Sequence, residues 1–268
     1  MSSTTGQSWK VGRYDGATPY DLGGIPYDIK VTKHVSVTKE AGTGSRKLAN
    51  IDSSGVYYTI DFKMKVQVLD TFINVYCIPT AEGAITPANL YVTNGITNRG
   101  FTAYCNTVTI EGNQTGAIVA SIQMVAVANE DKTVTITNAS QTPMTKAAVT
   151  TLSLGGTSIT KWTKWSFGVN NNVKVIATGN GVEATEIFAQ QAEYSGSITF
   201  VQTDALAYGF STDVAKDLII TLTDNQTVPV AKTYTFYDVR ATSNEYYVSE
   251  LDVTYESINW EGDELDIA

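Results

Sequence analysis

Alternating hydrophobic and polar positions predict β-strands along most of the chain. The most regular run covers residues 61–68, where every even position is apolar and every odd position is polar. Successive side chains of a strand point to opposite faces, so this period of two indicates one buried face and one face in water. Residues 31–37 show the same pattern more loosely, with valine at positions 31, 35 and 37.

Turn-forming segments between the alternating runs predict hairpins. Residues 107–110 and 118–124 flank a glycine-bearing turn at 111–116. Near the end of the chain, residues 233–239 and 247–255 are predicted to pair around a turn at Ser243 and Asn244. In the second half, the apolar spacing of residues 204–213 predicts a short helix that Asp204 caps.

One segment has no apolar stripe. Residues 40–50 contain two glycines together with Arg46 and Lys47. This composition predicts a long exposed loop, and loops of that length usually have a function of their own.

The pattern repeats along the chain. The strand that follows Gly55 leads to Asp70, and a similar strand that follows Tyr194 leads to Asp204. These two aspartates are 134 residues apart, which is half of the 268 residues. An internal duplication accounts for this spacing, and repeated β-units suit a protein that assembles into rings or lattices.

These elements predict a mainly β protein of two tandem β-sandwich or barrel-like domains, each with at most one short helix. Residues 1–26 have no regular period and are predicted to form an extended N-terminal arm, with Trp9, Tyr14 and Tyr20 as anchors on a neighbouring subunit. The expected domains are residues 27–150 and 151–260, and residues 261–268 form an acidic C-terminal tail.

Composition and charge exclude several classes of function. Charged residues are only 17% of the chain and hydrophobic residues 43%, so we expect a folded protein. A net charge of −9 argues against a surface that grips nucleic acid through its phosphates, although an acidic wall lets DNA pass without sticking. Residues 1–7 lack the features of a signal peptide, and no apolar run approaches ~18 residues, so we expect synthesis in a cytoplasm and no membrane span.

The sequence contains few side chains suited to catalysis or metal binding, so we predict no enzyme activity, no metal and no cofactor. His34 is the only histidine, and it falls on the polar side of an alternating strand. Cys77 and Cys105 are the only cysteines, and their spacing does not suit zinc, so buried reduced thiols are favoured over a disulfide. No spacing singles out the pair of acids that a glycosidase needs.

Several quoted segments together resemble the tail tube proteins of tailed phages and related viruses, above all the duplicated two-domain kind. They are the charged loop, the Tyr-Tyr-Thr-Ile-Asp-Phe strand that ends at Phe62, the Phe-Gly-Val-Asn-Asn-Asn segment that ends at Asn172, the Tyr-Ser-Gly-Ser-Ile-Thr-Phe strand that ends at Phe200, and the closing hairpin rich in Tyr and Thr. The resemblance covers roughly residues 27–260 and rests on loose patterns.

The resemblance implies a virion protein that polymerises as stacked rings into a hollow tube for the viral genome. A two-domain chain is expected to form trimeric rings that imitate hexamers. The implied partners are further copies of the chain, the tail tip protein, the tail terminator protein, the tape measure protein and DNA that passes without specific binding. The alternatives are another structural protein of a virion or injection machine, or a carbohydrate-binding or adhesion module with Trp162, Trp165 and Tyr246 as sugar platforms.

The resemblance also assigns roles to charged residues. In such tubes a long loop reaches the adjacent ring and one face of a sheet lines the lumen. The candidates for contact between rings are Glu40, Arg46, Lys47, Glu183 and Glu186, from residues 40–50 and the counterpart segment 179–191. The candidates for the lumen are Asp61, Lys63, Lys65, Glu250 and Asp252.

Overall fold

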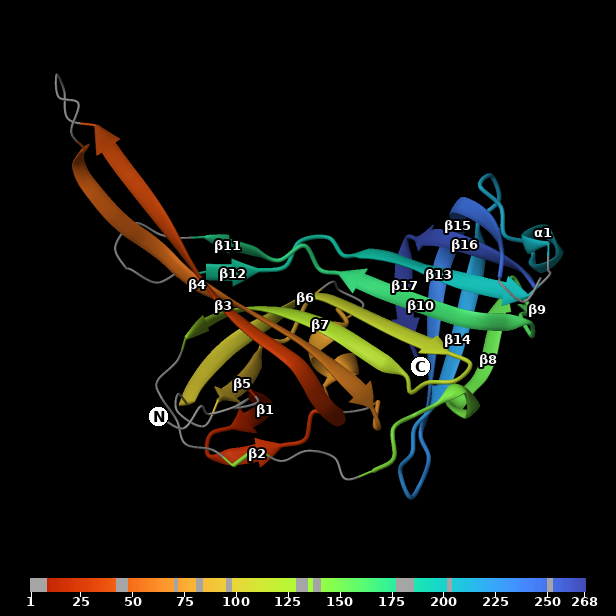
Figure 1. The fold of residues 1–268 in the computed structure, drawn as a ribbon, viewed down its shortest axis with the longest axis horizontal. Coiled ribbons are helices and arrows are strands. Elements are labelled where there is room, and N and C mark those ends of the chain that lie inside the picture. Colours follow the sequence, from red (N-terminus) through yellow and green to blue (C-terminus); the bar gives the residue numbers. More distant parts are fainter. Residues whose placement is uncertain are drawn as a thin grey trace.

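The structure of the chain is a computed structural model. It describes residues 9–41, 48–69, 72–80, 84–94, 98–128, 135–136, 141–176, 186–201, 204–249 and 253–268. Strands make up nearly all of the regular structure, and this confirms the prediction of a mainly β protein (Figure 1).

The elements divide near residue 149 into two successive sets. The first set of strands is β1 (Lys10–Asp15), β2 (Thr18–Tyr20), β3 (Gly24–Ala41), β4 (Leu48–Val66), β5 (Ala88–Thr93), β6 (Asn98–Asn113) and β7 (Val119–Ala128). The second set is β8 (Val149–Leu154), β9 (Thr157–Ser158), β10 (Trp162–Asn170), β11 (Lys174–Ile176), β12 (Glu186–Phe188), β13 (Glu193–Val201), β14 (Lys216–Thr223), β15 (Ala231–Val248), β16 (Thr254–Gly262) and β17 (Glu264–Ile267). The helical elements are the π-helix η1 (Ile73–Cys77), the 3-10 helix η2 (Lys146–Ala148) and α1 (Ala205–Tyr208).

Eight strands form one continuous antiparallel sheet, which we call the shared sheet. Their order is β3-β4-β7-β6-β10-β13-β16-β15. Four of these strands come from each half of the chain, and β6 pairs directly with β10 from Thr107↔Asn170 to Asn113↔Lys164. The two halves are therefore joined by main-chain hydrogen bonds within one sheet, in addition to their covalent link (Figure 1).

The flanking strands form a second layer in each half. In the first half β2, β1 and β5 continue from the N-terminal part of β6, and in the second half β9, β8 and β14 continue from the N-terminal part of β15. Each half thus has the same strand order, with η1 and α1 at equivalent places. A duplicated chain produces such a repetition, and the duplication itself stays a prediction.

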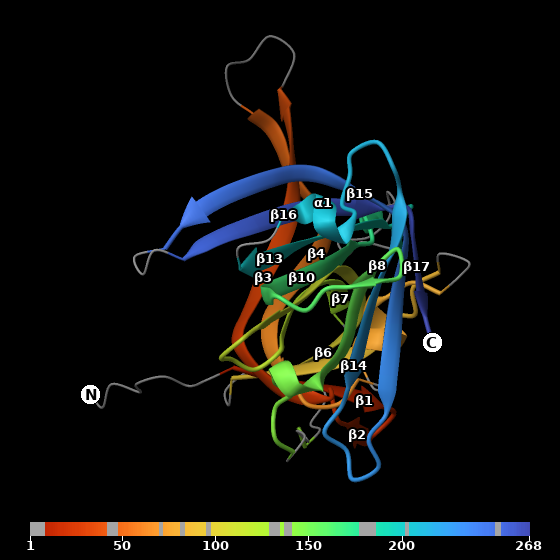
Figure 2. The ribbon, with the colours of Figure 1, turned by 90° about the vertical axis from the view of Figure 1, so that its right-hand side faces the viewer.

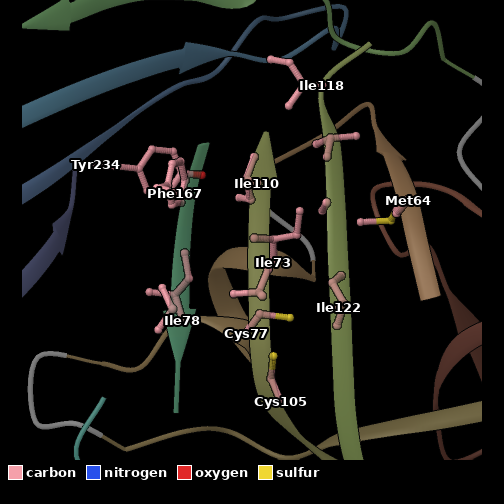
Figure 3. Close-up of a cluster of buried hydrophobic side chains, with 14 of the residues drawn as sticks. Met64, Ile73, Cys77, Ile78, Cys105, Ile110, Ile118, Ile122, Phe167 and Tyr234 are labelled. Carbon is pink, nitrogen blue, oxygen red and sulfur yellow. The ribbon is translucent and has the colours of Figure 1, made fainter. Parts of the chain in front are cut away.

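The hydrophobic core runs through both halves without a break. Phe167 of β10 lies with its ring 5.0 Å from that of Tyr234 and 5.2 Å from that of Phe236, both on β15. Figure 3 shows Phe167 and Tyr234 beside Ile110 of the first half. Burial of this apolar surface is the main force that holds the shared sheet against its flanking strands.

Two glycines allow tryptophans to lie flat across the shared sheet. Gly112 stands opposite Trp165, and Gly196 stands opposite Trp260. A Cβ atom at Gly112 would come within 2.8 Å of the Trp165 ring, and one at Gly196 would overlap both the Trp260 ring and the carbonyl oxygen of Ser166. Only glycine leaves room for these rings.

The alternation predicted for residues 61–68 holds within β4 and fails at Gln67. Phe62, Met64 and Val66 are buried, whereas Lys63 and Lys65 are exposed. Gln67 is fully buried although it occupies a polar position of the pattern, because it comes just after the strand has ended. The hairpin around residues 111–116 and the short helix capped by Asp204, which accepts a hydrogen bond from the Leu206 amide at 2.9 Å, are both confirmed.

The predicted turn at Ser243 and Asn244 is wrong. β15 continues through both residues, which pair with Asn259 and Ile258 of β16. The reason is that Asn244 uses its side chain across the sheet, where its amide donates to Glu256 Oε1 at 2.9 Å, rather than to cap a turn locally.

The two ends of the chain differ from the expected arm and tail. Within residues 1–26, β1 pairs with β5 and buries Val11, so the described part of this segment belongs to the sheet. Within residues 261–268, β17 pairs with β15 and buries Leu265. In both cases the free energy gained by burying one apolar side chain exceeds the conformational entropy that the segment loses when it is ordered.

Candidate assembly surface

One face of the shared sheet is polar across all eight strands. Its side chains are mostly small hydroxyl and amide groups that bond to one another from strand to strand. The Ser166 and Ser197 hydroxyls are 2.9 Å apart, and those of Thr199 and Ser257 are 3.3 Å apart. Gln123 Nε2 donates to Asp61 Oδ1 at 2.8 Å. Because these groups satisfy one another, the face needs no covering layer of protein.

Charges of both signs lie on this polar face. Lys164 Nζ is 3.5 Å from Glu111 Oε2, and Lys63 Nζ is 3.9 Å from Asp28 Oδ2. A hollow of about 270 Å³ lies near Asp61, Lys63 and Thr109. These ion pairs are exposed, so they contribute little to stability and chiefly set the surface potential.

The structure brings part of the predicted lumen set together. Asp61, Lys63 and Lys65 lie side by side in β4 with their side chains on the polar face. Glu250 and Asp252 lie outside the described residues. Whether this face lines a lumen stays a prediction.

Two of the predicted stacking residues, Glu40 and Glu186, lie in strands of two hairpins. β3 and β4 form a long hairpin that leaves the body of the molecule (Figure 1). The expected loop at residues 40–50 therefore begins and ends in strand, with Glu40 paired to Asn50. Glu186 begins β12, while Arg46, Lys47 and Glu183 lie outside the described residues.

The three anchors predicted for the N-terminal segment differ in their exposure to solvent. Trp9 and Tyr20 expose 37% and 39% of their surface, but Tyr14 exposes only 4% and belongs to the chain's own core. Tyr20 stacks under the Arg13 guanidinium at 4.4 Å. Tyr14 is thus unavailable as an anchor on a neighbour, because leaving the core would cost its burial energy.

The shared sheet ends in two open edges. β3 pairs only with β4 among the described strands. Beyond Ala241, whose amide donates to the Ser211 carbonyl at 2.9 Å, residues 242–248 of β15 pair only with β16 among these strands. Figure 2 shows the β15–β16 hairpin extending beyond the other strands. Tyr246 and Val248 on this hairpin are 63% and 65% exposed.

An open edge with exposed apolar side chains is a ready template for pairing with another chain. The open edge of β15 was not predictable from the local pattern, because Ser243 and Asn244 favour a turn. The uninterrupted run of three apolar residues that begins at Tyr246 was the available signal.

The described residues show no candidate metal site. Among them, no group of three or more His, Cys, Asp or Glu side chains lies close enough to hold a metal ion. The His34 ring stacks on Tyr57 at 4.6 Å and bonds to Thr59, both on the polar face. In this part of the chain no helix has the length and apolar character needed to cross a membrane.

The two cysteines are free and fully buried, as the sequence predicted. Figure 3 shows their sulfur atoms turned toward each other. Burial, together with the hydrogen bond between the thiols, raises the pKa of Cys77 well above its usual range. Cys77 is therefore a protonated and inert thiol at neutral pH.

Two of the proposed sugar platforms are also ruled out by burial. Trp162 and Trp165 lie in the core, and only Tyr246 is exposed.

Comparison with known proteins identifies the family. No curated protein matches the chain. The family model described as the phage tail tube protein matches residues 3–261, nearly the whole length, and the mainly β fold with open sheet edges agrees with it. The chain therefore belongs to the phage tail tube protein family.

Proposed function

We propose that this chain polymerises as stacked rings into a hollow tail tube through which the viral genome passes during ejection. Family membership makes the chain a structural protein of the virion tail. The observation that carries the finer proposal is the pairing of β6 with β10, since one chain already contains a sheet-to-sheet joint and leaves an open edge at each end for the next one.

The polar face of the shared sheet is the proposed wall of the lumen. Its hydroxyl and amide groups are bonded to one another, and its lysines stand beside acids such as Glu111. A net charge of −9 adds a weak general repulsion of phosphates. DNA would slide along such a wall without specific binding.

In this proposal the number of chains in a ring follows from the two similar halves of each chain. Each chain supplies two units, residues 27–150 and residues 151–260, so a trimeric ring would imitate a hexamer. The β3–β4 hairpin would reach the adjacent ring and carry the stacking contacts. At the ends of the tube the partners would be the tail tip protein, the tail terminator protein and the tape measure protein, after synthesis in the host cytoplasm.

Negative-stain electron microscopy of the purified protein tests this function. At high concentration, or after addition of a tail tip extract as a nucleus, we expect hollow tubes of stacked rings. Subunits that stay monomeric under both conditions would count against the tube. A glycan-binding screen would then test the adhesion module, for which Tyr246 is the remaining exposed platform.

A further inference from the structure

The two halves can be aligned residue by residue through a shared irregularity. β6 has a bulge between Cys105 and Thr107, opposite Met124 and Gln123 of β7. β15 has a bulge between Ala241 and Ser243, opposite Trp260 and Asn259 of β16. Every one of these positions in the first half corresponds to the one 136 residues later, because 241 − 105 and 260 − 124 are both 136. A bulge is a fixed structural marker, so it sets the equivalence without any need for sequence identity.

The same offset extends to the other two strand pairs. Gln123 pairs with Asp61 of β4, and its equivalent Asn259 pairs with Ser197 of β13, again 136 residues apart. Asp61 in turn pairs with Lys30 of β3, and Ser197 pairs with Ser166 of β10. Residues 29–34 of β3 are thus equivalent to residues 165–170 of β10.

The internal joint has a defined register and hydrogen-bond pattern. Thr109 of β6 stands opposite Gly168 of β10. At the two ends of the joint the Asn171 amide donates to the Asn106 carbonyl at 2.7 Å, and the Gln114 amide donates to the Thr163 carbonyl at 3.0 Å. Hydrogen-bonded pairs alternate with non-hydrogen-bonded ones, so pairs on the polar face, such as Thr109 with Gly168, are the non-hydrogen-bonded kind with the closer side chains.

We propose that the open edge of β15 pairs with the open edge of β3 in a second copy, in the register of the internal joint. Applying the offset places Glu245 opposite Thr32 of the second copy, Tyr246 opposite Val31 and Ser243 opposite His34. This inference rests on the proposed function and adds to it the partner surface and its residue-level register.

Both faces of the proposed joint are complementary. On the core side, the exposed Tyr246 and Val248 meet Val31 and Ile29, which are only partly buried in one copy. A slip by one residue would put these apolar groups on the polar face, so the pattern disfavours it. On the polar side, Glu245 lies diagonal to Lys30, which gives opposite charges across the joint.

Four cysteine variants test the register. Each adds one cysteine to the two native ones: Thr32→Cys and His34→Cys on β3, and Ser243→Cys and Glu245→Cys on β15. Each β3 variant is mixed with each β15 variant under assembly conditions and oxidised mildly, which gives four mixtures. The native thiols are fully buried and do not interfere. Directly opposite residues have Cβ atoms about 4.5–5.5 Å apart, and non-hydrogen-bonded pairs such as these lie at the short end of that range. Diagonal residues have Cβ atoms somewhat under ~7–8 Å apart. A disulfide needs a Cβ–Cβ distance of about 3.5–4.5 Å.

We expect two of the four mixtures to form disulfide-linked dimers on a non-reducing gel. The Thr32→Cys with Glu245→Cys mixture and the His34→Cys with Ser243→Cys mixture should give about tenfold more dimer than the crossed mixtures, since only their Cβ atoms come within disulfide range. Tubes formed by each variant alone, seen by electron microscopy, show that the substitutions leave folding and assembly intact.

The outcomes separate the two proposals. If tubes form but the crossed mixtures give the most disulfide-linked dimer, or no mixture gives any, the proposed register is wrong and the tube function stands. Wild-type protein that forms no tubes, together with no cross-linking in any mixture, would overturn both.

Discussion

At the scale of single residues, Gly196 leaves less room for a Cβ atom than any other described glycine of the shared sheet. The Trp260 ring lies where a side chain at position 196 would be, on the core side of strands β13 and β16. The ring also packs 5.0 Å from that of Phe236, so it has no free space to move into.

We therefore expect Gly196→Ala to destabilise the protein by about 1–3 kcal/mol through overpacking. Thermal unfolding followed by circular dichroism measures this as a lower Tm. Gly168→Ala is the matched control in the neighbouring strand, because a Cβ there comes no closer than 3.3 Å, to the Thr109 side chain. If the two variants have the same Tm, the close approach of Trp260 to Gly196 does not limit the size of the residue at position 196.

The raised pKa of Cys77 predicts a dependence of stability on alkaline pH. The folded state holds the thiol proton more tightly than the unfolded state, so the stabilisation is full below the unfolded pKa of about 8.5 and is lost as pH rises above it. The free energy of unfolding should fall by about 1.4 kcal/mol per pH unit through this one group, until the pH reaches the pKa of the folded state.

Urea unfolding at about pH 7.5 and about pH 9.5, around the usual thiol pKa, measures this fall. Cys77→Ala is the control, since it lacks the titrating group and should show a smaller loss between the two pH values. An equal loss in both proteins would assign the effect to other groups.

At the scale of elements, strand alternation and the helix cap could be predicted from the sequence because both are local. Phe62 and Met64 follow a period that the sheet requires, and Asp204 needs only the next two residues to act as a cap. The continuation of β15 through Ser243 and Asn244 was not predictable in this way. Those residues favour turns on their own, and it is Glu256 on another strand that holds Asn244 in place.

The β3–β4 hairpin permits a test of the stacking role. Deleting residues 40–50 removes the end of the hairpin, where Glu40 pairs with Asn50, and leaves the strand pairs from Ser36↔Ser54 inward. We expect subunits with an almost unchanged Tm that no longer form tubes in electron microscopy. Tubes of normal length from this variant would show that the hairpin end does not carry the contact between rings.

At the scale of the whole molecule, the open edges were hidden from sequence reasoning because an edge is defined by what does not pair with it. Val31 has the pattern of an ordinary strand residue, and Tyr246 lies just before a predicted strand. Only the strand order shows that each lies on an outermost strand. The polar face was easier to anticipate, since Asp61, Lys63 and Lys65 mark it by their alternation alone.

Charge reversal at Glu245 should weaken the joint between copies. Glu245→Lys would put a lysine diagonal to Lys30 of the next copy, and we expect a cost of about 0.2–1 kcal/mol per joint. Sedimentation or light scattering measures this as a higher concentration for assembly, with a smaller effect at high salt.

The double variant Glu245→Lys with Lys30→Glu restores opposite charges and should recover part of the assembly. Asp266→Lys changes the net charge equally on the exposed side of β17, and it should assemble like the wild type. Equal weakening by Asp266→Lys would mean that total charge, rather than the joint, controls assembly.

The β6–β10 joint also has a kinetic consequence. Its two strands are tethered in one polypeptide, so this joint forms during folding at any protein concentration. The proposed joint between β15 and β3 of another copy would be bimolecular, so its formation would depend on protein concentration. In a growing ring every second joint between β-units would therefore already be formed within a chain. The number of chains needed for a nucleus would be half that of a single-domain protein. The rate of nucleation would therefore depend less steeply on protein concentration than it would for a single-domain protein.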